Sequence, residues 1–186
     1  QKLLKIIETV KCIVVIDEAY TDFSGGSLMD ELSAHSNLII LKTFSKSWGL
    51  AGIRLGYAVA SKEMISLLKS VQVPFTTNVI SQALIPLMIR EKDYLEKAIS
   101  EVIDEREWLA KELSKFKDLK VYPSKANFLL VELTSEQLTI RDLIDGLFKQ
   151  GILIRGQSQL PGLERCARIT VGTREMNQRL LDAIYK

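Results

Sequence analysis

Hydrophobic residues form continuous runs in some segments of the chain and follow helical spacing in others. Residues 12–16 and 38–41 are unbroken apolar runs that include β-branched side chains, which is typical of strands buried on both faces of a sheet. We predict these strands over residues 12–16 and 38–42. Residues 25–37 predict a turn, a short helix and a second turn, so we expect these two strands to be parallel. A third strand, over residues 54–60, follows too soon for a crossover helix. It is expected to be antiparallel or to be reached by a loop.

Helical periodicity surrounds these strands. Ser61 and Asn78 each stand just before an apolar-periodic segment, where serine and asparagine are favoured as N-caps. The most extended pattern is amphipathic, with apolar residues three and four positions apart. The predicted helices of this part cover residues 2–9, 61–70, 78–90 and 93–116.

The second half of the chain has shorter, mixed elements. We predict strands and helices, in chain order, over residues 120–133, 139–150, 152–155, 166–173 and 174–185. The fold class is therefore α/β, with part of an α/β sheet in residues 1–90 and an α+β layer in residues 91–186.

Composition favours an ordinary globular protein. Hydrophobic residues make up 47% of the 186 residues, charged residues make up 26%, and the net charge is +2. No block of basic residues stands out, so a nucleic-acid or membrane partner is not expected. The apolar runs are also far shorter than a membrane span.

Two cysteines and one histidine limit the redox and metal chemistry. Cys12 and Cys166 lie far apart and are interpreted as free thiols in a reducing compartment, the cytoplasm. His35 is the one histidine, so a zinc site is not expected. His35 itself is predicted to be a solvated surface residue.

A carboxylate follows the first predicted strand directly. Asp17 stands at its carboxyl end, where open α/β sheets bind ligands, and Glu18 and Tyr20 come next. Aspartate is also favoured in turns and helix caps, so a purely structural role stays open.

A lysine follows the second predicted strand, at the same edge of the sheet. Lys46 can be a solvated loop residue, or the base of a pair with Thr43 as in penicillin-recognising enzymes, although their Ser-Asp-Asn and Lys-Thr-Gly motifs are missing. It can also be a Schiff-base lysine, which needs positive charge or burial to lower its pKa. Arg54 could supply that charge, and Asp17 could serve a cofactor's ring nitrogen.

Several stretches together carry a family resemblance. These are "VVIDEAYTDF", "LKTFSKSWGLAGIRLGYAVAS", "KANFLLVEL", "GILIR" and "RCARITVGTREMNQRLL". In this order and spacing they resemble the pyridoxal-phosphate-dependent aminotransferases of fold type I, and within them the histidinol-phosphate aminotransferases. The resemblance spans the whole chain but only the C-terminal half of such an enzyme.

The resemblance implies roles for the residues around Lys46. Lys46 would be the catalytic residue, binding pyridoxal 5'-phosphate as a Schiff base and carrying the proton between substrate and cofactor. Asp17 would pair with the pyridinium nitrogen, and Tyr20 would donate to the phenolic oxygen of the cofactor. The cofactor phosphate would be held by Thr43, Ser45 and Arg54.

The resemblance also implies a substrate site in the second half. Arg168 would bind the anionic end of the substrate, Arg155 would add a second positive charge, and Asn127 would lie near the substrate. Two guanidinium groups suit a phosphate dianion. Without the resemblance, the two arginines would be interpreted as ion-paired residues at strand ends.

The implied fold is part of the large-domain sheet in residues 1–90 and a small C-terminal domain in residues 91–186. The implied reaction interconverts histidinol phosphate and imidazole-acetol phosphate with glutamate and 2-oxoglutarate, in a homodimeric enzyme with small-molecule substrates. The chain is expected to be an inactive fragment, because it opens within a helical pattern and lacks the N-terminal half of the site. Three alternatives stay open: threonine-phosphate decarboxylase, a broad-specificity aromatic aminotransferase, and a non-catalytic effector domain of a transcription regulator.

Overall fold

The computed structural model describes residues 2–185, which divide after Glu96 into two compact units. Unit 1 ends at Glu96 and unit 2 begins at Lys97, within one helix. The assignment of residues 1–90 and 91–186 to a large and a small aminotransferase domain stays a prediction.

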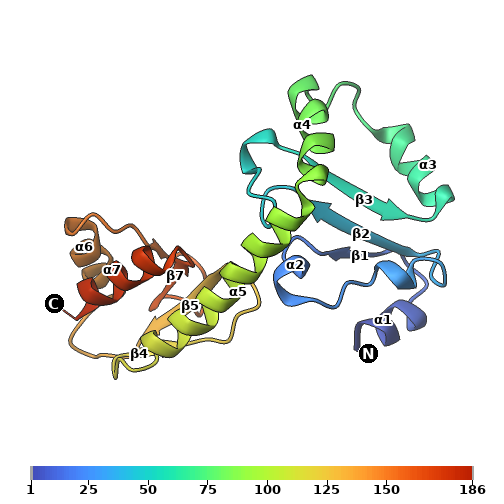
Figure 1. The fold of residues 1–186 in the computed structure, drawn as a ribbon. Coiled ribbons are helices and arrows are strands. Elements are labelled where there is room, and N and C mark those ends of the chain that lie inside the picture. Colours follow the sequence, from blue (N-terminus) through green and yellow to red (C-terminus); the bar gives the residue numbers. More distant parts are fainter. Residues whose placement is uncertain (1, 186) are drawn as a thin grey trace. The chain divides into compact units, whose positions relative to one another are not determined.

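Unit 1 is built on a three-stranded sheet of order β1-β2-β3 (Figure 1). Strands β1 (Val14–Asp17) and β2 (Leu38–Thr43) are parallel, and β3 (Gly56–Ala60) runs antiparallel to β2. The parallel pairing predicted for β1 and β2 is confirmed, and of the two alternatives left open for β3 the antiparallel one is observed. The third strand begins two residues later than predicted, because Arg54 adopts a left-handed conformation (φ 53°) that a strand does not accommodate.

The helices of unit 1 begin where their capping residues stand. The hydroxyl of Ser61 accepts a hydrogen bond from the Met64 N–H, and Asn78 accepts one from the Ser81 N–H, so both predicted N-caps are confirmed. In chain order the helices are α1 (Lys2–Thr9), α2 (Thr21–Ser24), η1 (Met29–Glu31), η2 (Ala51–Ile53), α3 (Lys62–Val71), α4 (Val79–Arg90) and α5 (Lys92–Leu113), the last of which continues into unit 2.

The prediction that β1 is buried on both faces is wrong for this chain. Val14 and Ile16 pack with Ile7 of α1, but Val15 on the opposite face is 53% exposed. The physical reason is that β1 is an edge strand paired only with β2, and one of its faces is left open among the described residues. A run of β-branched residues indicates a strand but does not show what covers it.

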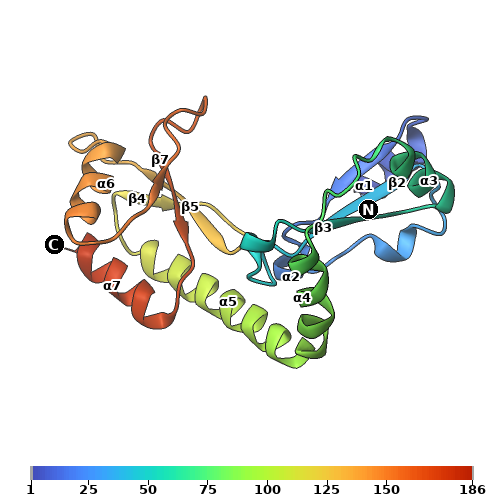
Figure 2. The same cartoon turned by 90° about the horizontal axis from the view of Figure 1, so that it is seen from above.

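Unit 2 is a four-stranded sheet of order β4-β5-β7-β6 with helices against it (Figure 2). All of its neighbouring strands are antiparallel. In chain order its elements after α5 are β4 (Leu119–Val121), β5 (Phe128–Leu133), α6 (Ile140–Lys149), β6 (Arg155–Gly156), β7 (Cys166–Thr170) and α7 (Arg174–Ile184).

Alternation along β5 and β7 divides the unit 2 sheet into two faces. Leu129 and Val131 of β5, with Ala167 and Ile169 of β7, are buried in one cluster with side chains from α5, α6 and α7. The residues between them, including Arg168, therefore face the other side of the sheet. This alternation places the arginine away from the helical core.

Three predicted strands of unit 2 were wrong in extent, and one of these, over residues 166–173, ends at Thr170. Residues 120–133 form two strands, because Pro123 cannot donate to a ladder and Ser124 makes a turn by donating to the Phe128 carbonyl. Residues 152–155 are strand only at Arg155, although Ile154 is buried in the core.

The cysteines and the histidine lie in ordinary surroundings. Cys12 is exposed, Cys166 is buried, and both are free thiols. His35 is not the solvated residue that was predicted, because its side chain is only 15% exposed and lies 3.8 Å from Glu31 one helical turn away. Within residues 2–185, no three histidine, cysteine or acidic side chains gather as a metal site would need. No helix of this described part has the length and apolar character to cross a bilayer.

Gly56 allows the close approach of β3 to β2. A Cβ at this position would lie 2.8 Å from the Lys42 carbonyl oxygen of the neighbouring strand. We expect Gly56→Ala to lower the free energy of unfolding of unit 1 by about 1–3 kcal/mol, since β3 must move to relieve the overlap. Urea unfolding of Gly52→Ala is the control, because a Cβ on Gly52 meets no atom within 4 Å. Equal urea midpoints for Gly56→Ala and Gly52→Ala would contradict this prediction, because β3 would then move without loss of unfolding free energy.

Candidate active site

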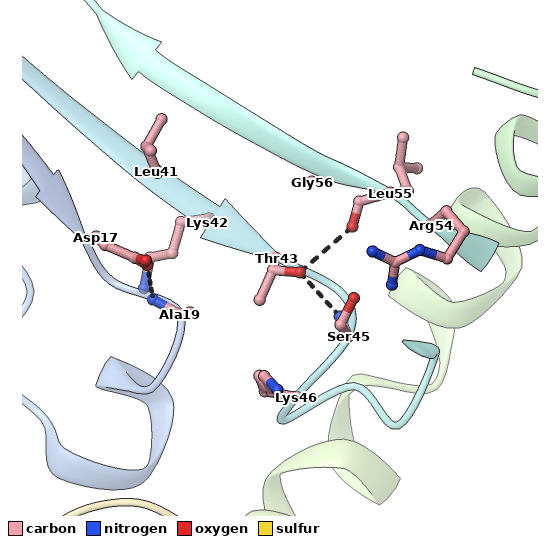
Figure 3. Close-up of a pocket in the computed structure, with 10 residues that line it drawn as sticks. All are labelled: Asp17, Ala19, Leu41, Lys42, Thr43, Ser45, Lys46, Arg54, Leu55 and Gly56. Atoms are coloured by element: carbon pink, nitrogen blue, oxygen red, sulfur yellow. Dashed lines mark hydrogen bonds between the residues drawn. The ribbon is translucent and has the colours of Figure 1, made fainter. Parts of the chain in front are cut away.

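An open cavity of about 420 Å³ lies at the carboxyl ends of β1 and β2 (Figure 3). Asp17 and Leu41 are register partners in the parallel pair, and Thr43 follows on the same face of β2. The cavity brings together five of the six cofactor residues predicted from the sequence. Its lining residues are Asp17, Ala19, Leu41, Lys42, Thr43, Ser45, Lys46, Arg54, Leu55 and Gly56.

Asp17 presents a carboxylate at the end of the first strand. Its Oδ1 accepts a hydrogen bond of 2.9 Å from the Ala19 N–H, which turns the chain away from the sheet. The side chain remains exposed to the cavity. It therefore has the turn role considered from the sequence and is also free to accept from a ligand through its other oxygen.

Hydroxyl groups and one guanidinium gather at the end of β2. The Thr43 hydroxyl accepts a 3.1 Å hydrogen bond from the Ser45 N–H and lies 3.5 Å from the Leu55 carbonyl. Figure 3 shows the Arg54 guanidinium on the same side as Thr43 and Ser45. Two hydroxyls beside a guanidinium form an arrangement suited to a phosphate.

The turn that carries Arg54 is held from outside the cavity. Arg54 has a left-handed backbone and donates from Nη1 to the Ala51 carbonyl at 3.0 Å. The buried Ser81 of α4 donates a 2.6 Å hydrogen bond to the Ile53 carbonyl, one residue before Arg54. Strained backbone of this kind persists where surrounding contacts fix it. The Ser81 contact was not predicted, because Ser81 is distant from Ile53 in sequence.

Two lysines line the cavity, and their surroundings differ. Lys42 Nζ lies 2.7 Å from Thr21 Oγ1, 3.2 Å from Glu18 and 3.3 Å from Asp22. Lys46 is exposed, and no carboxylate lies within ion-pair distance of its amine among residues 2–185. Its Nζ lies 5.3 Å from the centre of the Tyr20 ring, which brings the sixth predicted residue to the edge of the site. Lys46 is therefore the amine available to react.

Charge pairing keeps Lys42 protonated. Burial lowers its pKa, but the hydrogen bond to Glu18 and the charge of Asp22 outweigh burial, so the net pKa is raised. For Glu18, burial raises the pKa, while hydrogen bonds from the Leu28 N–H, Ser27 and Lys42 bring it below its usual value. An ammonium with a raised pKa is a poor nucleophile at neutral pH.

Arg155 and Arg168 are direct neighbours in unit 2. They are register partners on antiparallel strands β6 and β7, so their side chains stand on the same face of the sheet. No carboxylate lies within 4.0 Å of either guanidinium in the described part of the chain. The ion-paired strand-end alternative considered from the sequence therefore has no partner here.

Arg168 has an unsatisfied donor. Its Nε is buried and has no hydrogen-bond partner among the described residues, and its guanidinium lies 5.1 Å from the Phe128 ring. Like charges directly opposite each other in a sheet are unfavourable. Asn127, just before β5, belongs to the same ladder, where its carbonyl accepts a 3.0 Å hydrogen bond from the Val171 N–H. This face is suited to an anion.

A network behind the cavity was missed in the sequence. Glu18 is 3% exposed and Asp22 accepts hydrogen bonds on both of its oxygens. One signal for this network was available in the sequence. Side chains alternate along β2, so Lys42 points to the face opposite Leu41 and Thr43, where it can meet residues of the segment that follows β1. The partner residues could not be named in that way, because they lie in a loop and a four-residue helix.

Comparison with known proteins identifies the family of this chain. Residues 1–184 match the family described as aminotransferase class I and II. The chain belongs to the class I and II aminotransferases. Among curated members of this family, the histidinol-phosphate aminotransferase of Thermoanaerobacter sp. (strain X514) is 41% identical over 184 residues, covering 99% of this chain and 51% of that protein. The chain thus spans about half the length of the curated aminotransferases it matches.

Solved structures share the fold of this aminotransferase chain. The histidinol-phosphate aminotransferase from Clostridium acetobutylicum has a TM-score of 0.87 and 29% identity, covering 98% of this chain and 56% of that one. A decarboxylase from Sulfurospirillum multivorans gives 0.86 and 29%, covering 98% and 54%. The histidinol-phosphate aminotransferase from Sinorhizobium meliloti, in complex with pyridoxal-5'-phosphate, gives 0.80 and 26%, covering 92% and 47%. The prediction of a mixed α/β fold that matches part of an aminotransferase is confirmed.

Proposed function

We propose that this chain provides the cofactor-anchoring lysine and an anion-binding surface for the substrate of a histidinol-phosphate aminotransferase. The observation that carries the proposal is that Lys46, whose amine has no acidic partner in the described chain, shares a cavity with Asp17 and Arg54. An amine, a carboxylate and a guanidinium with adjacent hydroxyls match the reactive aldehyde, the ring nitrogen and the phosphate of pyridoxal phosphate.

The residues present fit this cofactor. Thr43, Ser45 and Arg54 would hold its phosphate, and Asp17 would hold the protonated ring nitrogen. Pyridoxal phosphate supplies an electron sink for the carbanion formed at the substrate α-carbon. Lys46 would attach the cofactor and hold or move the proton at that carbon, while Tyr20 would donate to the ring oxygen beside it.

The proposed substrate pair is histidinol phosphate and imidazole-acetol phosphate, with glutamate and 2-oxoglutarate as amino donor and acceptor. The names of the curated relatives support it, and so do the two arginines. Arg155 and Arg168 face the same side of the sheet, and the buried Nε of Arg168 lacks a partner among described residues. A phosphate dianion would satisfy that donor and neutralise the like charges. Asn127 is proposed to lie beside the substrate.

A second candidate is the decarboxylation of a phosphorylated amino acid. The decarboxylation step is supported by the decarboxylase of Sulfurospirillum multivorans, which is 29% identical to this chain, as is the aminotransferase of Clostridium acetobutylicum. The two arginines would serve either substrate. Product analysis of an enzyme carrying this site separates them, because decarboxylation releases carbon dioxide and transamination releases a keto product.

The resemblance extends the proposal to the assembly. We propose that unit 1 is part of the large, cofactor-binding domain and unit 2 the small domain, and that the enzyme is a cytoplasmic homodimer. The family match over residues 1–184 supports the placement of both units in one aminotransferase subunit.

The cofactor assignment is tested by titrating this chain with pyridoxal phosphate and recording the visible absorbance of amine-bound cofactor. We expect a band that saturates in the unmodified chain and is absent from Lys46→Arg, which keeps the charge but cannot attach the cofactor. Lys62→Arg, an exposed lysine at the start of α3, is the matched control. A band of equal size in Lys46→Arg would refute the assignment.

The substrate assignment predicts opposite effects on stability and binding at Arg168. We expect Arg168→Met to weaken binding of histidinol phosphate about 10- to 100-fold, as lost hydrogen bonds to a charged group do. The same change removes an unsatisfied buried donor and a like-charge neighbour, so unit 2 should unfold at equal or higher urea concentration.

The measurements for Arg168 are calorimetric titration and urea unfolding of the same sample. Arg141→Met is the control, since the Arg141 side chain is 88% exposed on α6 and is paired with Asp145 one turn away. Weaker binding with a lower unfolding midpoint would mean that Arg168 is a structural residue.

A further inference from the structure

The loop that carries Lys46 is joined to α2 by a single carboxylate. Asp22 Oδ2 accepts a hydrogen bond from the hydroxyl of Ser47, the residue after Lys46. Asp22 Oδ1 lies 3.3 Å from Lys42 Nζ. The two oxygens of one side chain therefore bind two segments, the end of β2 and the loop beyond it.

The other side of this contact is firmly anchored. Lys42 lies 3.2 Å from Glu18 Oε2 and donates to Thr21 Oγ1 at 2.7 Å. Glu18 is 3% exposed and accepts 2.7 Å hydrogen bonds from the Leu28 N–H and the Ser27 hydroxyl. A continuous chain of charged and polar contacts thus runs from a buried glutamate to the residue beside Lys46.

The Lys46 loop has few other restraints of its own. The Gly49 N–H donates to the Lys46 carbonyl at 3.1 Å, and the Leu50 N–H donates to the Phe44 carbonyl at 3.0 Å. The side chain of Lys46 is exposed and contributes no ion pair within residues 2–185. Lys46 Nζ lies 5.3 Å from the centre of the Tyr20 ring, and the Ser45 N–H donates to the Thr43 hydroxyl at 3.1 Å. The Ser47–Asp22 contact is a side-chain hydrogen bond that ties this loop to α2.

We propose that Asp22 is a positioning residue for Lys46, holding its loop through Ser47 while Lys42 and Glu18 fix Asp22 in place. The consequence of this inference, that Lys46 is kept where the cofactor binds, rests on the proposed function. The contact itself does not depend on that function. Asp22 does not itself line the cavity, and its link to the segment that carries Lys46 is the hydrogen bond from Ser47, so it acts on Lys46 through the loop.

Hydrogen–deuterium exchange of this chain without cofactor tests the positioning. We expect the amides of Gly49 and Leu50 to exchange about tenfold faster in Ser47→Ala and Asp22→Ala, because loss of a hydrogen bond to a charged group favours local opening. Ser47→Thr keeps the hydroxyl and should restore the unmodified rate. Asp30→Ala, at an exposed acidic residue of η1, is the matched control.

Ser47→Ala is the decisive variant, because it leaves the Lys42–Glu18 pair intact and should not change the urea midpoint of unit 1. Unchanged loop exchange in Ser47→Ala, or equally fast exchange in Ser47→Thr, would overturn the proposal. The dissociation constant for pyridoxal phosphate should also rise about tenfold in Ser47→Ala and return in Ser47→Thr. If the unmodified chain binds no cofactor at Lys46, the proposed function fails, while the exchange rates still decide the positioning role.

Discussion

Lys42→Met lowers the free energy of unfolding of unit 1 by about 3–5 kcal/mol, because it leaves the Glu18 carboxylate buried without a cation. Glu18 has a 2% exposed side chain, and Lys42 lies 3.2 Å from it at 13% exposure. Methionine keeps most of the volume of lysine, so the effect reports the missing charge rather than a cavity. Urea unfolding followed by the fluorescence of Trp48 in unit 1 measures it.

The pH dependence of this effect gives a second test. The pKa of Glu18 is lowered in the folded chain, since hydrogen bonds and Lys42 outweigh burial. Its contribution to stability is therefore present above the unfolded pKa, near 4.5, and is lost as pH falls through the folded pKa. In Lys42→Met the Glu18 carboxyl group can take up a proton, and the free-energy cost of this protonation falls as the pH falls. The difference in the free energy of unfolding between Lys42→Met and the unmodified chain should therefore shrink in acid. Lys62→Met, on the exposed start of α3, should show no difference at any pH. If Lys42→Met lowers the free energy of unfolding by the same amount at low pH, the loss comes from packing and not from charge.

The two units are expected to unfold separately, with unit 1 first. Among the described residues, the buried apolar cluster between α1 and the sheet of unit 1 contains three residues, Ile7, Leu38 and Ile40. That of unit 2 contains fourteen among the described residues. Each fully buried aliphatic side chain contributes about 1.5–3 kcal/mol before entropy is subtracted, so the units differ greatly in driving force.

Hydrogen exchange at increasing urea concentration resolves the two units. We expect amides of β1 and β2 to lose protection while those of β5 and β7 remain protected. Leu129→Ala should lower the second transition by about 2–5 kcal/mol and leave the first in place, which identifies the units. A single cooperative loss of protection throughout the chain would contradict this expectation.

Local patterns in the sequence predicted most elements, because each is determined by near neighbours. Ser61 and Asn78 mark their helices through hydrogen bonds three residues away, and the connection between β1 and β2 indicated that these strands are parallel. The break at Pro123 was missed although the proline itself was the signal. The open face of β1 could not be predicted, since burial depends on what packs against a strand.

The residues of the candidate site were also predictable only where local sequence determines their position. Asp17 and Lys46 could be placed at one edge of the sheet, because both follow parallel strands directly. The roles of Asp22 and Ser81 depend on contacts 25 or more residues away in sequence, which no local pattern encodes. Nothing in the sequence distinguished Lys42 from any other strand residue. Its three partners explain why, of the two lysines that line the cavity, Lys46 is the one with no acidic partner among the described residues.

The central claim is that Lys46 is the amine that holds pyridoxal phosphate. It is tested most directly by mixing this chain with pyridoxal phosphate, reducing with borohydride, and mapping the labelled lysine by peptide mass spectrometry. We predict the label on Lys46, with Lys42 unmodified because its ammonium is paired with Glu18 and Asp22. Label on Lys42, or spread evenly over the exposed lysines, would contradict the claim.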